Sequence, residues 1–129
     1  MKKTFTKEER LCGKVLIDNL FSSGSSFLVY PIRIVFKPLP KDNSRYPAQS
    51  IISVSKRRFK RAHDRNRIKR LLREVYRQQK SEFLYTKLEE LSLNLNLAIQ
   101  FIGKEEFSYT QLYEKMNKAL KQISNELSK

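Results

Sequence analysis

The sequence contains few of the residues that protein-borne catalytic and metal sites require. It has one cysteine, Cys12, and one histidine, His63, so an internal disulfide is impossible and the histidine has no partner for a metal. Its paired acidic residues are widely scattered, at 8–9, 89–90 and 105–106, whereas a two-metal nuclease clusters its carboxylates. We therefore expect no catalytic residue and no metal ligand in this protein.

Long apolar runs are also missing. No segment approaches the ~18 uncharged apolar residues of a membrane span, and the N-terminus lacks the apolar core of a signal peptide. We therefore expect a cytoplasmic protein that does not contact membranes. The 129 residues suit one domain, so we predict a single domain over 1–129, flexible at 1–7 and frayed at 124–129.

Positive charge is abundant, and it is concentrated in one segment. The formal net charge is +14, and residues 56–80 hold 12 cations against 2 anions. Residues 1–55 contribute a net +5 and residues 81–129 a net −1. An imbalance of this size indicates a polyanionic partner for the basic segment.

Hydrophobic periodicity predicts an alternation of helices and strands. Thr6 and Glu9 have the spacing of a capping box before the first helix. The predicted helices span 8–23, 64 to about 91, and a last segment that begins at Ser108 or Thr110; the predicted strands span 27–37, 48–55 and 95–103. This order predicts an α+β domain with helices packed against a small sheet.

The basic segment has an ordinary explanation, a solvated helix face, but its pattern argues against that. Solvated faces usually alternate charge signs at i and i+4, whereas Arg61, Arg65, Lys69, Arg73 and Arg77 form a continuous like-charged series at that spacing. Several of these cations also lie in the first turns of the helix, where the dipole favours anions. Repeated violation of local rules marks a candidate functional site.

Phosphate is the ligand that suits these residues. Most of the cations are arginines, which bind phosphate oxygens in a bidentate manner and stack on bases. Asn66 can donate and accept hydrogen bonds to a base edge or a 2′-hydroxyl, although it also suits a helix start. Ile68, Leu71 and Leu72 occupy the opposite face and anchor the helix to a core. A rigid helix of this kind is suited to reading the shape of RNA.

The stretch SVSKRRFKRAHDRNRIKRLLREVYR resembles the signature of the bacterial ribonuclease P protein component. Its centre is Arg-Asn-Arg at 65–67, followed by Ile-Lys-Arg at 68–70, two leucines and Arg73. The Ser-Val-Ser-Lys strand end at 53–56, the Arg-Leu pair at 10–11 and the Phe and Gly at 21 and 24 match as well. The resemblance covers residues 5 to 123.

The resemblance implies a fold and a role. The fold is one compact α+β domain similar to a domain of ribosomal proteins, with a mixed sheet of about four strands, three helices in the order α-β-β-(β)-α-β-α, and a left-handed βαβ crossover. The role is that of protein subunit of the endoribonuclease ribonuclease P. In that enzyme a catalytic RNA removes the 5′ leader of precursor tRNA, and the protein binds this RNA and the single-stranded leader. Mg²⁺ is held mainly by RNA phosphates, and no other protein is an obligate partner.

The resemblance also assigns residues to two surfaces. The surface for the RNA subunit and the adjacent leader consists of Lys56, Arg57, Arg58, Arg61, Arg65, Asn66, Arg67, Lys69, Arg70 and Arg73. The leader cleft consists of Ile17, Phe21, Arg33 and Val35, with Ile17 where the family has an aromatic residue. The sequence also departs from the family at 58–61, where small residues are common, and at His63, where an aliphatic residue is common.

Two alternative functions remain open at this point. One is a general RNA-binding or ribosomal-type protein that uses the same fold without a role in processing. The other is a metal-dependent nuclease that acts alone, which the scattered carboxylates disfavour.

Overall fold

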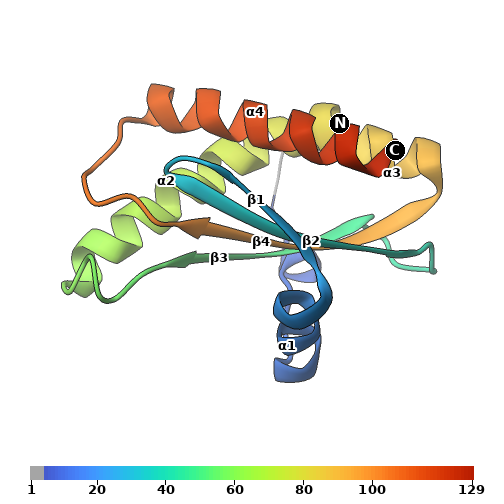
Figure 1. Cartoon of the computed structure of the whole chain (residues 1–129), viewed down its shortest axis with the longest axis horizontal. Helices are drawn as coiled ribbons and strands as arrows, with labels where there is room; N and C mark the ends of the chain where they lie inside the picture. Colours follow the sequence, from blue (N-terminus) through green and yellow to red (C-terminus); the bar gives the residue numbers. More distant parts are fainter. Residues whose placement is uncertain (1–4) are drawn as a thin grey trace.

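Four strands form one mixed sheet in the computed structural model, which describes residues 5–129 (Figure 1). They are β1 (Ser25–Val29), β2 (Ile32–Pro40), β3 (Ala48–Val54) and β4 (Leu93–Phe101), in the spatial order β1-β2-β4-β3. The β1–β2 and β2–β4 pairs are antiparallel, and β3–β4 is parallel. The predicted α+β class is confirmed.

The prediction of one strand over 27–37 was wrong. A turn at Tyr30 and Pro31 divides this apolar run, and β1 folds back on β2 so that Ser25 lies opposite Phe36. β2 continues to Pro40, three residues beyond the predicted end of the strand. The composition did not reveal the turn because apolar residues continue on both sides of it.

Successive side chains of β2 point to opposite faces of the sheet, and the two faces pack against different residues. Ile32, Ile34 and Phe36 belong to the main core, which also contains residues from the long helices. Val35 lies on the other face, in a small cluster with Leu11, Leu20 and Ala98.

Helices cover both faces of the sheet (Figure 1). α1 (Lys14–Ser23) lies on one face, while α2 (Ala62–Lys80), α3 (Thr86–Leu91) and α4 (Tyr109–Leu127) lie on the other. A π-helical turn (Ser81–Tyr85) joins α2 to α3, so the long helical stretch predicted from 64 to about 91 is confirmed. The Ser108 cap is also confirmed, because its hydroxyl accepts a hydrogen bond from the Gln111 amide at 3.2 Å.

The first half of the predicted helix over 8–23 was wrong. Residues Lys7–Glu9 form a short 3-10 turn, and α1 begins only at Lys14. Between them the amide of Leu11 donates to the carbonyl of Ser50 at 2.8 Å, which attaches this segment to the edge of β3. Gly13 then adopts a φ of 99°, a left-handed conformation that favours glycine.

The chain ends were expected to be flexible at 1–7 and frayed at 124–129. Residues 1–4 lie outside the described part of the chain, while Phe5 packs edge-on against Tyr76 with ring centroids 5.8 Å apart. At the other end α4 continues to Leu127, and Ser124 donates to the carbonyl of Phe83 at 2.8 Å. Within residues 5–129 no helix combines the length and apolarity needed to span a bilayer.

Candidate nucleic-acid interface

The first turns of α2 present the basic residues on a rigid helix. Ile68, Leu72 and Val75 are almost completely buried and fix the helix against the sheet. Because these positions face inward, Asn66 and most of the predicted basic residues face solvent. The exposed basic residues are Lys56, Arg57, Arg58, Arg61, Arg67, Arg70 and Arg73. Arg65 and Lys69 are half-buried.

Most of this charge is not neutralised inside the described part of the protein. Of the nine predicted basic residues, only Arg67 forms an ion pair there, with Glu106 at 2.7 Å. Both side chains of this pair are about half exposed, so the pair contributes only ~0–1 kcal/mol and exchanges readily for a phosphate contact. The arrangement leaves α2 with a largely uncompensated cationic face.

Two arginines of the basic segment shape the loop that precedes α2. The Arg65 guanidinium donates to the carbonyls of Phe59 and Lys60 at 2.7 and 2.8 Å, and Arg58 donates to the carbonyl of Ile102. A guanidinium has five N–H donors, so both residues retain donors for a ligand. Sequence reasoning treated them only as contact residues and did not foresee this structural role.

The four predicted cleft residues come from α1 (Ile17 and Phe21) and from β2 (Arg33 and Val35), and they differ in exposure. Phe21 and Arg33 are exposed, whereas Ile17 is half-buried and Val35 is only 2 % exposed. Val35 therefore lies in the floor under α1, and Phe21 and Arg33 provide the accessible surface. Arg33 and Val35 lie two positions apart on β2 and therefore share one face of the sheet.

The sheet register adds residues that the sequence analysis missed. Leu28 of β1 lies opposite Arg33, Arg33 lies opposite Gln100, and Gln100 lies opposite Ser53 of β3. The Arg33 guanidinium donates to Gln100 Oε1 at 3.4 Å. This cross-strand row extends from exposed Leu28 to the strand end that leads into Lys56. Only the strand order, which the sequence does not contain, could have revealed the row.

One cation of the basic segment belongs to the interior. Lys80 is buried at the end of α2 and donates to the carboxylate of Glu9, which also accepts from the Tyr85 hydroxyl. The Lys80 ammonium lies 5.3 and 5.2 Å from the ring centroids of Phe5 and Tyr85. Burial lowers the pKa of Lys80, while the adjacent carboxylate opposes that change. This cluster ties the segment before α1 to the helical layer.

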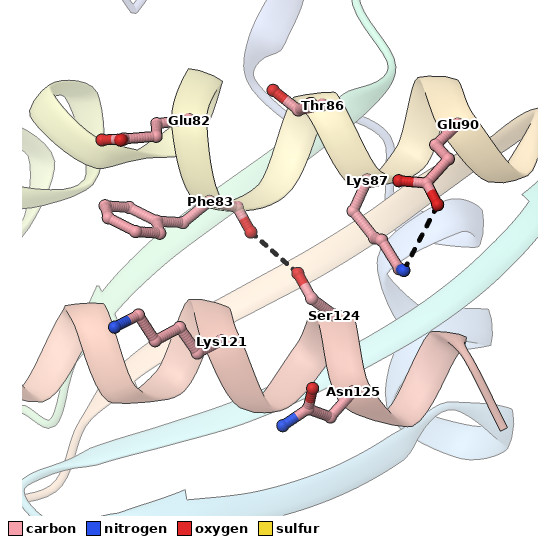
Figure 2. A pocket seen from close by; sticks show the side chains of 8 residues that line it. All are labelled: Glu82, Phe83, Thr86, Lys87, Glu90, Lys121, Ser124 and Asn125. Atoms are coloured by element: carbon pink, nitrogen blue, oxygen red, sulfur yellow. Dashed lines mark hydrogen bonds and ion pairs between the residues drawn. The ribbon is translucent and has the colours of Figure 1, made fainter.

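A separate pocket of about 370 Å³ lies in the helical layer, between the π-helical turn with α3 and α4 (Figure 2). Its polar groups largely satisfy one another: Lys87 pairs with Glu90 at 3.7 Å, and Ser124 donates to the carbonyl of Phe83. It lies on the face of the sheet opposite α1 and is not part of the candidate interface. Nowhere in residues 5–129 do three potential metal-ligating side chains cluster.

The fold places the chain in a known structural class. It superposes on the RNase P protein of Staphylococcus aureus with a TM-score of 0.68 at 19 % identity, covering 89 % of this chain and 94 % of that one. It superposes on the RNase P protein of Thermotoga maritima with a TM-score of 0.67 at 23 % identity, covering 89 % and 97 %. The chain, with its mixed four-stranded sheet covered by helices, therefore shares the small α+β fold of these two proteins.

The sequence identifies the family within that class. The chain belongs to the Ribonuclease P family, whose model matches residues 5–124. The ribonuclease P protein component of Porphyromonas gingivalis is 34 % identical over 119 residues, covering 92 % of this chain and 85 % of the relative. That of Chlorobium phaeobacteroides is 36 % identical over 104 residues, covering 75 % and 70 %. Membership makes the chain a protein component of a tRNA-processing enzyme complex that includes an RNA subunit.

Proposed function

We propose that this protein binds the catalytic RNA of ribonuclease P and the single-stranded 5′ leader of precursor tRNA, and so assists the RNA in removing the leader. The observation that carries the proposal is the uncompensated cationic face at the start of α2, where one exposed ion pair is the only internal neutralisation of the nine predicted basic residues within residues 5–129. Helix N-termini and arginines both favour phosphate ligands, and here they occur together.

The two surfaces have different tasks in this proposal. The exposed residues of α2 and the loop before it dock on the RNA subunit and neutralise its backbone. The cleft between α1 and the sheet holds the leader, with Phe21 available for base stacking and Arg33 for a phosphate. Because Ile17 replaces an aromatic residue, grip on the leader depends more on charge than on stacking, which contributes about 1–3 kcal/mol per base.

The chemistry remains with the RNA in this proposal. The described residues offer no cluster of metal ligands, and the exposed His63 is the only histidine in the chain. We infer that Mg²⁺ is held mainly by RNA phosphates. The protein supplies charge neutralisation and a fixed path for the leader, which raise substrate affinity and favour metal binding near the scissile bond.

A reconstitution assay tests the proposal. The protein is mixed with a bacterial ribonuclease P RNA at low Mg²⁺ concentration, and cleavage of a precursor tRNA is followed on a gel. We expect removal of the leader to require both components. Binding without stimulation of cleavage would favour the general RNA-binding alternative, and cleavage without the RNA would favour an independent nuclease.

The salt dependence of RNA binding provides a second test. If about six to ten phosphates are neutralised, the affinity falls steeply with salt concentration because condensed counterions are released. An affinity that hardly changes between low and physiological salt would contradict the role assigned to the cationic face.

A further inference from the structure

A small pocket lies at the outer edge of the sheet, along β3, and shares Arg73 with the proposed RNA-binding surface. It has a volume of about 180 Å³, below the ~300–1,000 Å³ of typical small-molecule sites. Its walls come from the segment before α1, from β3 and from α2; they are Phe5, Arg10, Leu11, Cys12, Ser50, Ile51, Ile52 and Arg73.

The pocket combines an apolar wall with two free cations. Arg10 and Arg73 are exposed, and neither side chain has an ion pair or hydrogen bond within the described residues. The wall between them contains Phe5 and Ile52. Since the carbonyl of Ser50 already points to this edge, alternation along the strand directs the N–H and C=O of Ile52 to the same side.

The pocket adjoins the apolar cluster under α1 and the basic face of α2. Leu11 and Ile51 line the pocket and also belong to the small apolar cluster under α1. Arg73 belongs to the cationic face of α2. We therefore expect a strand of RNA that passes α1 and crosses this edge of the sheet to meet the pocket.

We propose that this edge pocket binds one nucleotide of the precursor tRNA leader, with Arg10 and Arg73 on its phosphates and the base against Phe5 and Ile52. The inference rests on the proposed function, because it names an additional contact of the leader. A single-nucleotide pocket suits an unpaired strand whose bases are splayed, whereas a folded RNA is recognised mainly by its shape and backbone.

Cys12 provides a built-in probe, because it lines the pocket, is exposed and is the only cysteine of the chain. The protein is assembled with ribonuclease P RNA in Ca²⁺ to slow cleavage, and the rate of Cys12 alkylation by iodoacetamide is measured. We expect a several-fold slower reaction with a precursor that carries a long leader. With the RNA subunit alone, or with a precursor whose leader is too short to reach the pocket, the rate is expected to stay near that of the free protein.

The outcomes separate the alternatives. If the complex assembles and cleaves in Mg²⁺ but the alkylation rate of Cys12 is unchanged, the nucleotide-binding role of the pocket is overturned and the proposed function stands. If the complex fails to assemble or to cleave, the proposed function itself is overturned. Full protection by the RNA subunit alone overturns the assignment to the leader. The control is Cys12→Ser combined with Asn125→Cys, which moves the thiol to the pocket between α3 and α4 and is expected to react equally in every complex (Figure 2).

A substitution that removes the charge of Arg10 provides an independent test of the pocket. Arg10→Gln is expected to weaken binding of the long-leader precursor, and to lower the salt slope by about one unit at most, without changing assembly with the RNA subunit. The matched control is Arg45→Gln, which removes the same charge from an exposed residue that pairs only loosely with Glu8 at 4.0 Å. Equal effects of the two variants would contradict a specific role for Arg10.

Discussion

The buried cluster of Glu9, Lys80 and Tyr85 gives the sharpest test of what holds this fold together. The Glu9 side chain is fully buried and that of Lys80 is 3 % exposed. Glu9→Gln keeps an acceptor for the Tyr85 hydroxyl and for the amide of Thr6, which donates to Glu9 at 2.9 Å, but it removes the charge. The ammonium of Lys80 is then buried without a counter-charge.

The expected cost follows from that burial. Removing one partner of a buried ion pair typically costs about 3–5 kcal/mol, because the remaining charge stays desolvated. For a chain of this length such a loss lowers Tm by on the order of 10 °C or more. Lys80→Met, which leaves the carboxylate unpaired, is expected to be destabilising for the same reason. The double substitution removes both charges, so it is expected to cost less than the sum of the two single substitutions.

The destabilisation caused by Glu9→Gln is expected to depend on pH in a definite direction. In the Glu9→Gln variant the pKa of Lys80 falls further below its usual ~10.4, because burial is no longer opposed by the carboxylate. As pH rises toward that usual value, the folded state has released the Lys80 proton while the unfolded chain still holds it. Stability rises with pH wherever the unfolded state binds more protons, so the deficit relative to wild type shrinks above neutral pH.

Urea unfolding followed by circular dichroism at pH 7 and at pH 9.5 measures both effects. The control is Glu126→Gln, which removes a carboxylate from an exposed pair with Lys129 at 3.4 Å and is expected to cost at most ~1 kcal/mol. The reasoning is refuted if Glu9→Gln is no more destabilising than this control, or if the double variant loses as much as the two single variants together.

Three further predictions concern other parts of the molecule. Burial raises the pKa of Tyr76 to about 12, so above pH ~10 this hydroxyl ionises only in the unfolded chain and the stability of the wild-type protein falls as pH rises. In urea titrations, Tyr76→Phe is expected to make stability depend less on pH in this range. Arg67→Ala combined with Arg70→Ala is expected to impair assembly with the RNA in a filter-binding assay while circular dichroism stays near wild type, and an unfolded double variant would make these residues structural. Gly24→Ala is expected to lower Tm, because its Cβ would lie 2.4 Å from the carbonyl oxygen of Leu20.

Much of the architecture could be predicted because it depends on local patterns. The apolar stripe that includes Ile68 and Leu72 reports which side of α2 is buried, and it was interpreted correctly. The start of α1 could not be predicted in this way. Leu11 lies at helical spacing from Val15, but Glu9 binds Lys80, which lies 71 positions away, and Leu11 pairs with β3. Contacts of that range are absent from any local window.

The candidate site, like the fold, could be predicted only where it depends on local patterns. The resemblance and the charge pattern predicted which residues of α2 carry positive charge, and the structure shows nearly all of them to be accessible. Neither could show that Val35 is covered by α1, because coverage depends on where that helix packs. The row from Leu28 through Arg33 and Gln100 likewise exists only once β1 has folded back on β2 and β4 has entered between β2 and β3.

The position of each cation on α2 decides what it does, although the sequence presents them as one block. Lys80 faces the core and pairs with Glu9, so its charge stabilises the fold and is not available to RNA. Arg65 is turned back on the preceding loop, where its hydrogen bonds to carbonyls fix the path of the chain from β3 into the helix. Arg70 and Arg73 have no such internal partner within the described residues and remain exposed. The exposed cations still repel one another, and binding to a phosphate backbone relieves this repulsion. The inward-facing cations therefore rigidify the helix, whereas the exposed cations drive association with RNA.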